Sequence, residues 1–301
     1  MRKTVVITGA SGLLGRALRR ELATAPGWTV RGTALRRAGA GLDGVNLRDR
    51  PAMERYLRDV SPDVVIHSAA ERRPDTAEKD PEGTIDLNVN VTRDLVAAAA
   101  EVGAWVVFLS TDYVFDGTQP PYPPEATTCP LNLYGRTKCD AEQALRQIMP
   151  KAAVLRVPIL YGQIESLDES AVTILAKKMI ESDRPLPCDH WAIRYPTHVD
   201  DVAVVCRQVL ERQESHGDMS GILHWSGDEP MTKYEMALAM APILGRDSST
   251  LRPVTNPPPG APRPQNCHLD CARLESLEIG RHTPFAEAMP AVLDPHLPTR
   301  S

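Results

Sequence analysis

A glycine-rich turn, Gly9-Ala10-Ser11-Gly12-Leu13-Leu14-Gly15, constrains the fold of this chain more than any other feature. It follows the β-branched run Thr4–Thr8 directly and opens a helical pattern at Gly12–Ala25. Glycine at such a junction lets the backbone approach a pyrophosphate, whose charge then lies on free N–H groups at the helix N-terminus. The last glycine lets helix and strand pack closely. A tight turn without a ligand is the alternative, but the strand and helix on either side favour phosphate binding.

Short apolar runs alternate with longer helical patterns through the first half of the chain. The expected strands are Thr4–Thr8, Thr29–Thr33, Val64–Ser68, Trp105–Ser110 and Ala153–Val157. The expected helices are Gly12–Ala25, Pro51–Val60, Gly83–Val102 and Tyr134–Ile148. Strands that are joined through helices imply right-handed crossovers. The sequence therefore predicts an α/β fold with a doubly wound parallel sheet of the Rossmann type.

The second half is less regular, and it predicts a smaller C-terminal α+β part. Its helical patterns cover Ala171–Ile180, Val199–Arg212 and Lys233–Met240. Six prolines between Leu251 and Pro264 exclude a continuous helix or a central strand there. We expect a nucleotide-binding Rossmann domain over residues 1–157, to which helices near 195–212 return. A smaller substrate-type or regulatory part is expected over residues 158–301.

Two arginines follow the second expected strand, in Thr33-Ala34-Leu35-Arg36-Arg37. Folds that prefer NAD place an acidic residue near this point, where it accepts hydrogen bonds from the ribose. Two guanidinium groups instead suit the 2′-phosphate of NADP, although an exposed arginine pair is the alternative. Asn46-Leu47-Arg48-Asp49 lies where such folds contact the adenine, and Ser68-Ala69-Ala70 supplies small residues at a strand end. The sequence thus predicts NADP as the cofactor.

The run Tyr134-Gly135-Arg136-Thr137-Lys138 places a phenol and an ammonium on one face of an expected helix. Ser110-Thr111-Asp112 ends the fourth expected strand, at the carboxyl edge where doubly wound folds bind ligands. A phenol has a pKa of about 10, and a neighbouring ammonium acts to lower it. If the site is active, Thr111, Tyr134 and Lys138 are the predicted catalytic residues. An exposed helix pair without chemistry is the alternative.

Together these motifs resemble the extended short-chain dehydrogenase/reductase superfamily. The runs Ser110–Gly117 and Pro130–Gly135, with Lys138, look like its dTDP-4-dehydrorhamnose reductase (RmlD-like) branch. Further runs look more closely like the family of methionine adenosyltransferase II β subunits, the regulatory partners of an S-adenosylmethionine synthetase. These runs are Ala69–Asp75, Leu155–Gly162, Glu169–Thr173, Arg194–Val199, His224–Gly227, Met231–Ala237, Arg263-Pro264, Leu269–Cys271 and Thr283–Phe285.

The resemblance implies an NADP-binding scaffold that modulates the catalytic synthetase subunit, without an established reduction of its own. It implies cofactor contacts from Ala10–Leu13, Arg36–Ala38, Leu47, Arg48, Ala69, Arg73, Tyr134 and Leu160, and Lys138 joins them from the reductase pattern. With the glycine turn, the predicted cofactor set is Gly9, Ala10, Ser11, Gly12, Leu13, Leu14, Gly15, Arg36, Arg37, Ala38, Leu47, Arg48, Ala69, Arg73, Tyr134, Lys138 and Leu160.

The chain departs from the β-subunit pattern after Phe285. In that family an aromatic, basic tail follows this point and docks on the catalytic partner, whereas residues 286–301 contain no Phe, Tyr or Trp. Aromatic and arginine side chains usually dominate interface energy. Pro290, Pro295 and Pro298 also oppose a docking helix. The sequence therefore does not support binding through this tail and leaves a contact elsewhere on the surface open.

An NADPH-dependent sugar-nucleotide reductase is the competing interpretation, because the predicted catalytic residues are intact. Against it, the segment Gly162–Glu169 carries two Glu and one Asp, an unpromising lining for a phosphorylated sugar. Arg194 and Arg263 offer compensating charge, although each also suits a structural ion pair. The sequence alone leaves open whether hydride transfer takes place.

Composition excludes several other classes of protein. Thirty-four Lys and Arg against 39 Asp and Glu give a net charge of −5, which argues against binding nucleic acid or an anionic membrane. No run approaches the roughly 18 apolar residues of a membrane span, and no signal peptide is expected. Six cysteines are too few for a disulfide scaffold, and the histidines lack metal-ligand spacing. We expect a cytoplasmic protein without a metal site.

Overall fold

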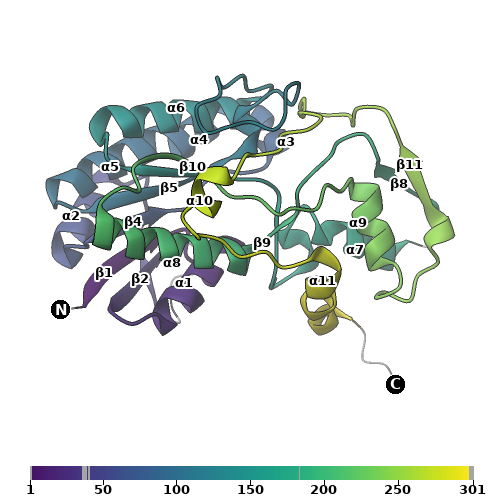
Figure 1. The fold of residues 1–301 in the computed structure, drawn as a ribbon, viewed down its shortest axis with the longest axis horizontal. Coiled ribbons are helices and arrows are strands. Elements are labelled where there is room, and N and C mark those ends of the chain that lie inside the picture. The colour runs from purple at the N-terminus through teal and green to yellow at the C-terminus, as the bar shows by residue number, and fades with distance from the viewer. Residues whose placement is uncertain (1, 36–38, 40, 183, 298–301) are drawn as a thin grey trace.

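The computed structural model describes residues 2–35, 39, 41–182 and 184–297. Within these residues, a seven-stranded parallel sheet forms the larger part of the molecule, with strand order β10-β6-β5-β4-β1-β2-β3 (Figure 1). Its strands are β1 Lys3–Thr8, β2 Trp28–Ala34, β3 Leu42–Gly44, β4 Val64–His67, β5 Trp105–Thr111, β6 Ala153–Val157 and β10 Gly221–His224. Because the chain winds outward from β1 through β3 and then returns to β4, the strand order reverses between β1 and β4. Ligands bind at such a switch point in doubly wound sheets.

Helices cover both faces of this sheet (Figure 1). α1 Leu13–Thr24 and α8 Val199–His216 pack on one face, whereas α2 Arg50–Val60, α5 Val91–Glu101 and α6 Leu133–Ile148 pack on the other. Alternate strand residues divide between the two layers: Val5 and Ile7 join the cluster of α1 and α8, and Val6 joins that of α2 and α5. Strands that are covered on both faces are apolar on both, which explains their short hydrophobic runs.

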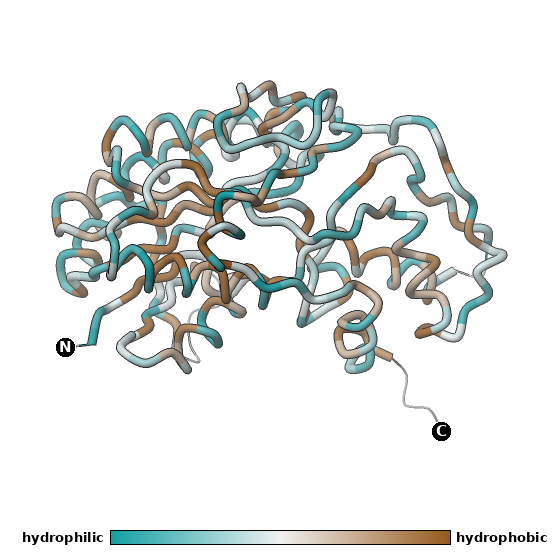
Figure 2. Tube along the Cα trace, viewed as in Figure 1, coloured by the Kyte–Doolittle hydropathy of each residue, from teal (hydrophilic) through white to brown (hydrophobic). Residues whose placement is uncertain are grey.

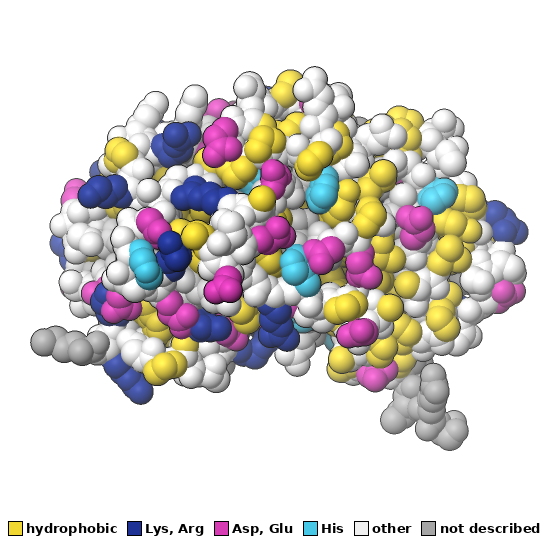
Figure 3. All heavy atoms as spheres, in the orientation of Figure 1, with side chains coloured by type: hydrophobic (Ala, Val, Ile, Leu, Met, Phe, Trp, Pro, Cys, Tyr) yellow, Lys and Arg dark blue, Asp and Glu magenta, His cyan; other side chains and the backbone are white. Residues whose placement is uncertain are grey.

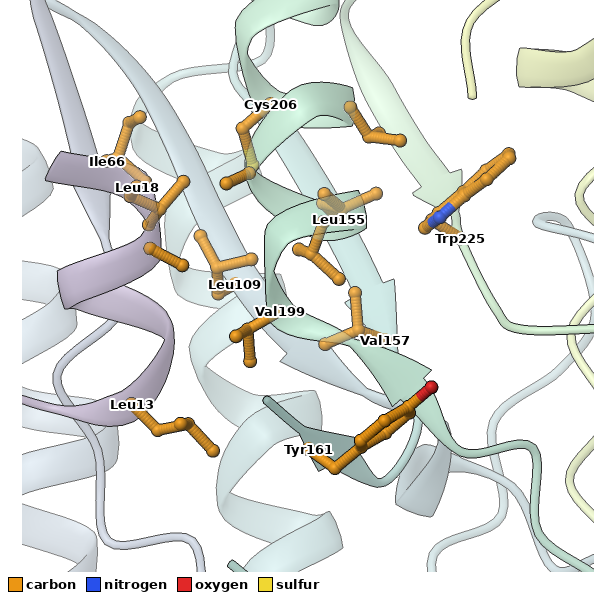
Figure 4. Close-up of a cluster of buried hydrophobic side chains, with 14 of the residues drawn as sticks. Leu13, Leu18, Ile66, Leu109, Leu155, Val157, Tyr161, Val199, Cys206 and Trp225 are labelled. Carbon is orange, nitrogen blue, oxygen red and sulfur yellow. The ribbon is translucent and has the colours of Figure 1, made fainter. Parts of the chain in front are cut away.

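The apolar core continues from the sheet into the C-terminal part. Hydrophobic residues follow the strands in Figure 2. In Figure 4, Leu18 of α1, Val199 of α8 and Leu155 of β6 belong to one cluster, which Tyr161 and Trp225 extend beyond the end of the sheet. Fully burying a large apolar side chain contributes about 1.5–3 kcal/mol, so this cluster ties the two parts of the chain together.

The C-terminal part is built from short elements. Two parallel strand pairs lie outside the main sheet, β8 Leu186–Asp189 with β11 Leu251–Val254, and β7 Leu160–Tyr161 with β9 Thr197–His198. Its helices are α7 Thr173–Glu181, α9 Lys233–Met240, α10 Ala272–Glu275 and α11 Phe285–Leu293. Two short helices, α3 Pro74–Lys79 and α4 Pro81–Ile85, follow β4. Short 3₁₀ turns lie at Asp112–Val114, Leu167–Glu169, Ser248–Thr250 and Asp294–His296.

The predicted α/β fold with a doubly wound parallel sheet is confirmed. Each of the five expected strands matches an observed strand to within one residue at either end. β10 was not predicted, because its four residues pair only at the sheet edge, beside β6. α8 packs along α1. The division at residue 157 stays a prediction.

The expected helix Gly83–Val102 is interrupted by the π-helical turn Asp86–Asn90. This turn aims Asn88 at the loop after β4, where its amide donates to Glu71 O and accepts from Glu71 N, both at 2.9 Å. A π turn inside a helix commonly marks a site where a side chain must be redirected. Periodicity in the sequence does not reveal it.

Three prolines were expected to oppose a docking helix after Phe285, yet a helix does form over residues 285–293. α11 forms there with Pro290 inside it. An internal proline costs a helix about 3 kcal/mol. Four apolar side chains are buried and offset this cost: Phe285, Met289, Val292 and Leu293. The helix therefore packs on its own chain.

Acidic and basic side chains are interspersed over the face of the molecule shown in Figure 3. All six cysteines are free thiols. Across the part of the chain that the structure describes, no helix has the length and apolar character needed to cross a membrane. The same residues contain no group of three or more His, Cys, Asp or Glu placed to hold a metal ion.

Candidate functional site

A cavity of about 1140 Å³ opens at the carboxyl edge of the sheet, beside the switch point. The ends of β1, β2, β4, β5 and β6 line one side of it, and residues of α7, α9 and the proline-rich segment line the other. Pockets for small ligands usually measure about 300–1,000 Å³. The cavity is therefore large enough for an extended ligand such as a dinucleotide.

The glycine turn forms the wall of the cavity between β1 and α1. Gly9 adopts a φ of +65°, and a Cβ there would lie 2.9 Å from the Ala69 backbone. A Cβ on Gly15 would lie 2.3 Å from Gly9 O. Thr33 O accepts from Ala10 N at 3.0 Å, and Gly9 O accepts from Gly12 N at 2.9 Å. The close packing of the last glycine, predicted from the sequence, is confirmed.

Gly15→Ala is expected to destabilise the fold by about 1–3 kcal/mol, because the added Cβ meets backbone atoms that cannot move aside. Gly12→Ala is the matched control. Its φ of −80° suits any residue, and its Cβ would lie 3.3 Å from Gly9 O. Urea unfolding without nucleotide measures both, and equal stability of the two variants would contradict this account of the turn.

Most of the predicted cofactor residues line this one cavity. They are Gly9, Ser11, Gly12, Leu13, Leu14, Gly15, Leu47, Arg48, Ala69, Arg73, Tyr134, Lys138 and Leu160. Ala10 differs, because it is fully buried and does not line the cavity. Arg36, Arg37 and Ala38 lie outside the described residues. Leu35, which precedes them, lines the cavity.

Arg48 and Arg73 reach the cavity from different elements. Arg48 Nη2 donates to Gly83 O at 2.9 Å, and its Nε lies 3.0 Å from an Asp86 carboxylate oxygen. These contacts tie the loop between β3 and α2 to α4 and the π turn. Arg73 precedes α3 and is exposed, and its backbone N–H donates to Glu71 Oε1 at 2.9 Å. Arg48 is thus held in place by neighbouring elements.

Thr111, Tyr134 and Lys138 meet in the cavity. Burial raises the pKa of the Tyr134 phenol, and a hydrogen bond with Thr111 opposes this rise. Lys138 Nζ instead donates to Leu109 O at 2.6 Å and lies 3.8 Å from the centroid of the Phe108 ring. Burial lowers the pKa of Lys138 to about 7, against the effect of Glu142. The expected lowering of the phenol's pKa by the ammonium was wrong for this structure, because burial dominates and the ammonium is directed at β5.

Replacing Lys138 is expected to change how stability depends on pH. Because its pKa falls from 10.5 to about 7 on folding, the unfolded chain binds the extra proton between these values. The contribution of Lys138 to the free energy of unfolding therefore rises with pH across that window. Lys138→Met should be most stabilised relative to the wild type near neutral pH, and the difference should shrink as the pH approaches about 10.

Urea unfolding of the nucleotide-free protein across this pH range measures the difference. Lys151→Met, which removes an exposed lysine two residues before β6, is the control for a lysine-to-methionine change that leaves Lys138 in place. A stability difference for Lys138→Met that is constant with pH would contradict the expected titration.

A buried ion pair joins α6 to β6 behind these residues. Arg156 Nη2 lies 2.7 Å from Glu142 Oε2, its Nε donates to Glu142 Oε1 at 3.0 Å, and the two side chains are 4% and 6% exposed. Ser110 also donates to Glu142. Glu142 was not among the site residues predicted from the sequence. The spacing of Tyr134, Lys138 and Glu142, each one helical turn apart on one face, was the signal that could have found it.

The acidic segment Gly162–Glu169 is neutralised by neighbouring helices. Arg16 of α1 lies 2.7 Å from Glu169 and 3.5 Å from Glu165. Asp168 lines the cavity, but Lys177 Nζ lies 2.6 Å from its carboxylate. Cations of α1 and α7 pair with all three carboxylates, and of the three only Asp168 lines the cavity. The expectation that this segment disfavours a phosphorylated sugar stays a prediction.

Comparisons of its sequence with known proteins agree on the family to which this chain belongs. The RmlD substrate binding domain family matches residues 2–297. Methionine adenosyltransferase 2 subunit beta from Pongo abelii is 48% identical over 296 residues, which cover 98% of this chain and 88% of that protein. A dTDP-4-dehydrorhamnose reductase from Mycolicibacterium smegmatis is 31% identical over 277 residues, which cover 91% of this chain and 80% of that protein.

The fold is shared with a solved reductase. The crystal structure of dTDP-4-dehydrorhamnose reductase from Bacillus anthracis in complex with NADP matches with a TM-score of 0.84. The match covers 98% of this chain and 99% of the reductase, at 24% sequence identity. This likeness shows the Rossmann-type architecture of both chains.

Proposed function

Because this chain belongs to the RmlD-like family, and within it to the methionine adenosyltransferase 2 β subunits, we propose that it is an NADP-binding, non-catalytic regulatory subunit of S-adenosylmethionine synthetase. The observation that carries the proposal is 48% identity to a β subunit across 98% of the chain. That match includes the glycine turn, the cavity and the C-terminal part. The subunit would modulate S-adenosylmethionine synthesis in the cytoplasm.

The residues around the cavity fit NADP. The N-terminus of α1 and the turn Gly9–Gly15 suit a pyrophosphate. Arg36 and Arg37 suit the 2′-phosphate by their charge, and Leu47 with Arg48 suits the adenine. Ala69 leaves room beside the ribose, and the nicotinamide would lie toward Thr111, Tyr134, Lys138 and Leu160. In a non-catalytic subunit NADP would act as a ligand that binds and stabilises the folded state.

The surroundings of the Tyr134 phenol and the Lys138 ammonium support the proposal that this subunit is a scaffold rather than an enzyme. A phenol whose pKa is raised by burial is a poor proton donor near neutral pH. The Lys138 ammonium donates to Leu109 O of β5. Both observations favour a scaffold over proton transfer by this pair.

Mixing the chain with a catalytic synthetase subunit tests the proposal. We expect the two to elute together from a size-exclusion column and the synthetase's kinetics to change, without oxidation of NADPH. A dTDP-4-dehydrorhamnose reductase, which shares the fold, is the control and should do neither. Absence of both co-elution and a kinetic change would contradict the proposed regulation.

One observation favours a second candidate function, a sugar-nucleotide reductase that uses NADPH. Thr111, Tyr134 and Lys138 line the same cavity. This function predicts NADPH oxidation with dTDP-4-dehydrorhamnose, reduced about 100-fold or more in Tyr134→Phe. Tyr56→Phe, at a tyrosine outside the cavity, is the matched control. No oxidation by the wild type would rule this candidate out.

A further inference from the structure

The 3₁₀ turn Leu167–Glu169 and the two residues before it cross one side of the cavity. Asp168 of this turn lines the cavity, and so does Ser170, which follows the turn. We call residues 165–169 the bridge segment. Its flanks are fixed in the fold, because Ile164 and Ser170 are both buried. The bridge segment is thus a short connection between two fixed points.

Arg16 of α1 binds the bridge segment to the helix that follows the glycine turn. Its Nη1 and Nη2 each donate to a carboxylate oxygen of Glu169 at 2.7 Å, and Nη1 also donates to Ser11 O at 2.9 Å. The Arg16 and Glu169 side chains are only 17% and 11% exposed, so water and salt weaken this pair less than an exposed pair. One guanidinium therefore joins the bridge segment to the glycine turn.

Arg72 binds the bridge segment from the opposite side. It lies in the loop after β4, lines the cavity and donates to Glu169 O. β1 and β4 are neighbours in the sheet, and the glycine turn touches the base of this loop, where a Cβ on Gly9 would lie 2.9 Å from the Ala69 backbone. Glu169 is therefore bonded to both sides of the switch point at which the strand order reverses.

The bridge segment has little apolar packing of its own. Within it, Leu167 alone packs against the core cluster, and its side chain is half-buried. Polar contacts hold the remainder: Lys177 Nζ lies 2.6 Å from an Asp168 oxygen, and Thr173 Oγ1 donates to Leu167 O at 3.0 Å. A segment held by polar bonds opens at a lower cost in free energy than one held by buried apolar contacts. The Arg16–Glu169 pair is thus a large share of what keeps this segment closed.

We infer that the bridge segment is a lid whose release from Arg16 sets the rates at which a dinucleotide enters and leaves the cavity. The inference rests on the proposed function, because it requires NADP in the cavity. A dinucleotide whose pyrophosphate lies on the glycine turn would cross the switch point, beneath the residue that Arg16 and Arg72 hold from either side. Arg16 and Glu169 themselves do not line the cavity, so the pair acts on the nucleotide through the position of the lid. A subunit with such a lid keeps NADP as a long-lived ligand.

A lid and a binding contact differ in how they change the rates. When a lid opens more often, association and dissociation both become faster, and the equilibrium affinity changes little. When a binding contact is lost, dissociation becomes faster and association stays nearly the same. Measuring both rates therefore separates a lid from a contact.

Stopped-flow fluorescence of NADPH measures both rates on the full chain. Association is followed after mixing with NADPH, and dissociation after displacement by an excess of NADP, which does not fluoresce. We expect Glu169→Gln to raise both rate constants about tenfold, with an affinity within about threefold of that of the wild type. Glutamine keeps the size of the side chain and an oxygen that accepts from Glu165 N, so the turn is retained.

Glu165→Gln is the matched control. Its carboxylate belongs to the same segment and lies 3.5 Å from Arg16, but the side chain is 55% exposed. It should change each rate by less than about twofold. Arg16→Met removes the other partner, should raise both rates like Glu169→Gln, and decides the question if that variant does not fold. Because the two substitutions break one interaction, the double variant Arg16→Met/Glu169→Gln should be no faster than either single variant.

Rates in Glu169→Gln and Arg16→Met that equal those of the wild type would overturn the inference. Faster dissociation with unchanged association would also overturn it, and so would effects that add in the double variant, since these come from two independent contacts. Each of these results leaves the proposed function intact. A wild type that leaves the synthetase unchanged counts against the proposed function alone, because the rates then still decide the lid. A wild type that binds no NADPH overturns both.

Discussion

Glu142→Gln is expected to lower the free energy of unfolding by about 3–5 kcal/mol. The substitution leaves the Arg156 guanidinium, whose side chain is 4% exposed, without its carboxylate in the middle of the fold. Two hydrogen bonds from Arg156 and one from Ser110 lose their charged acceptor. A single domain is usually stable by about 5–15 kcal/mol, so this loss is a large fraction of the total. Urea unfolding of the nucleotide-free protein measures it.

Glu54→Gln is the matched control for this prediction. Glu54 pairs with Arg50 at 2.6 Å on α2, but the Arg50 side chain is 56% exposed. Exposed pairs of this kind contribute about 0–1 kcal/mol. The double variant Glu142→Gln/Arg156→Met should recover part of the stability, because it removes the unpaired charge. Similar small losses for Glu142→Gln and Glu54→Gln would contradict the structural role of the buried pair.

Reversing the charge of Arg36 and Arg37 together is expected to weaken NADP binding by about 100-fold or more. Each charge-assisted hydrogen bond to a phosphate contributes about 1.5–3 kcal/mol, and every 1.4 kcal/mol corresponds to about tenfold in affinity. Arg36→Glu/Arg37→Glu should leave NAD binding nearly unchanged, since NAD has no 2′-phosphate. Calorimetric titration of the variant with each nucleotide measures the change.

Arg55→Glu/Arg58→Glu makes the same change of charge on α2, where both arginines are exposed and neither lines the cavity. It should bind NADP like the wild type. Equal weakening by both double variants would mean that net charge, rather than a local contact with the 2′-phosphate, governs affinity.

The sheet could be predicted from the sequence because the pattern that identifies each strand lies within the residues of that strand. Short apolar runs between helical patterns mark β1, β2, β4, β5 and β6. Such a run is enough to identify a parallel strand that helices cover on both faces. The glycine turn and the Tyr134–Lys138 spacing are local in the same way. Both motifs lie at one cavity because the carboxyl ends of parallel strands are at the same edge of the sheet.

The features that could not be predicted depend on packing between segments that are distant in the sequence. α11 forms despite Pro290 because Phe285 and Met289 are buried against the core, which no local pattern reveals. Lys178 and Lys233 reach the cavity only through the arrangement of α7 and α9 in the C-terminal part. The pKa of Tyr134 was misjudged for a related reason, because burial outweighs the neighbouring ammonium.

Calorimetric titration of the purified chain with NADP and, separately, with NAD tests the central claim most directly. That claim is that the cavity beside the glycine turn selects a dinucleotide with a 2′-phosphate. We expect saturable heat with NADP and an affinity for NAD that is lower by about 100-fold. No heat with NADP, or equal affinity for the two nucleotides, would contradict it.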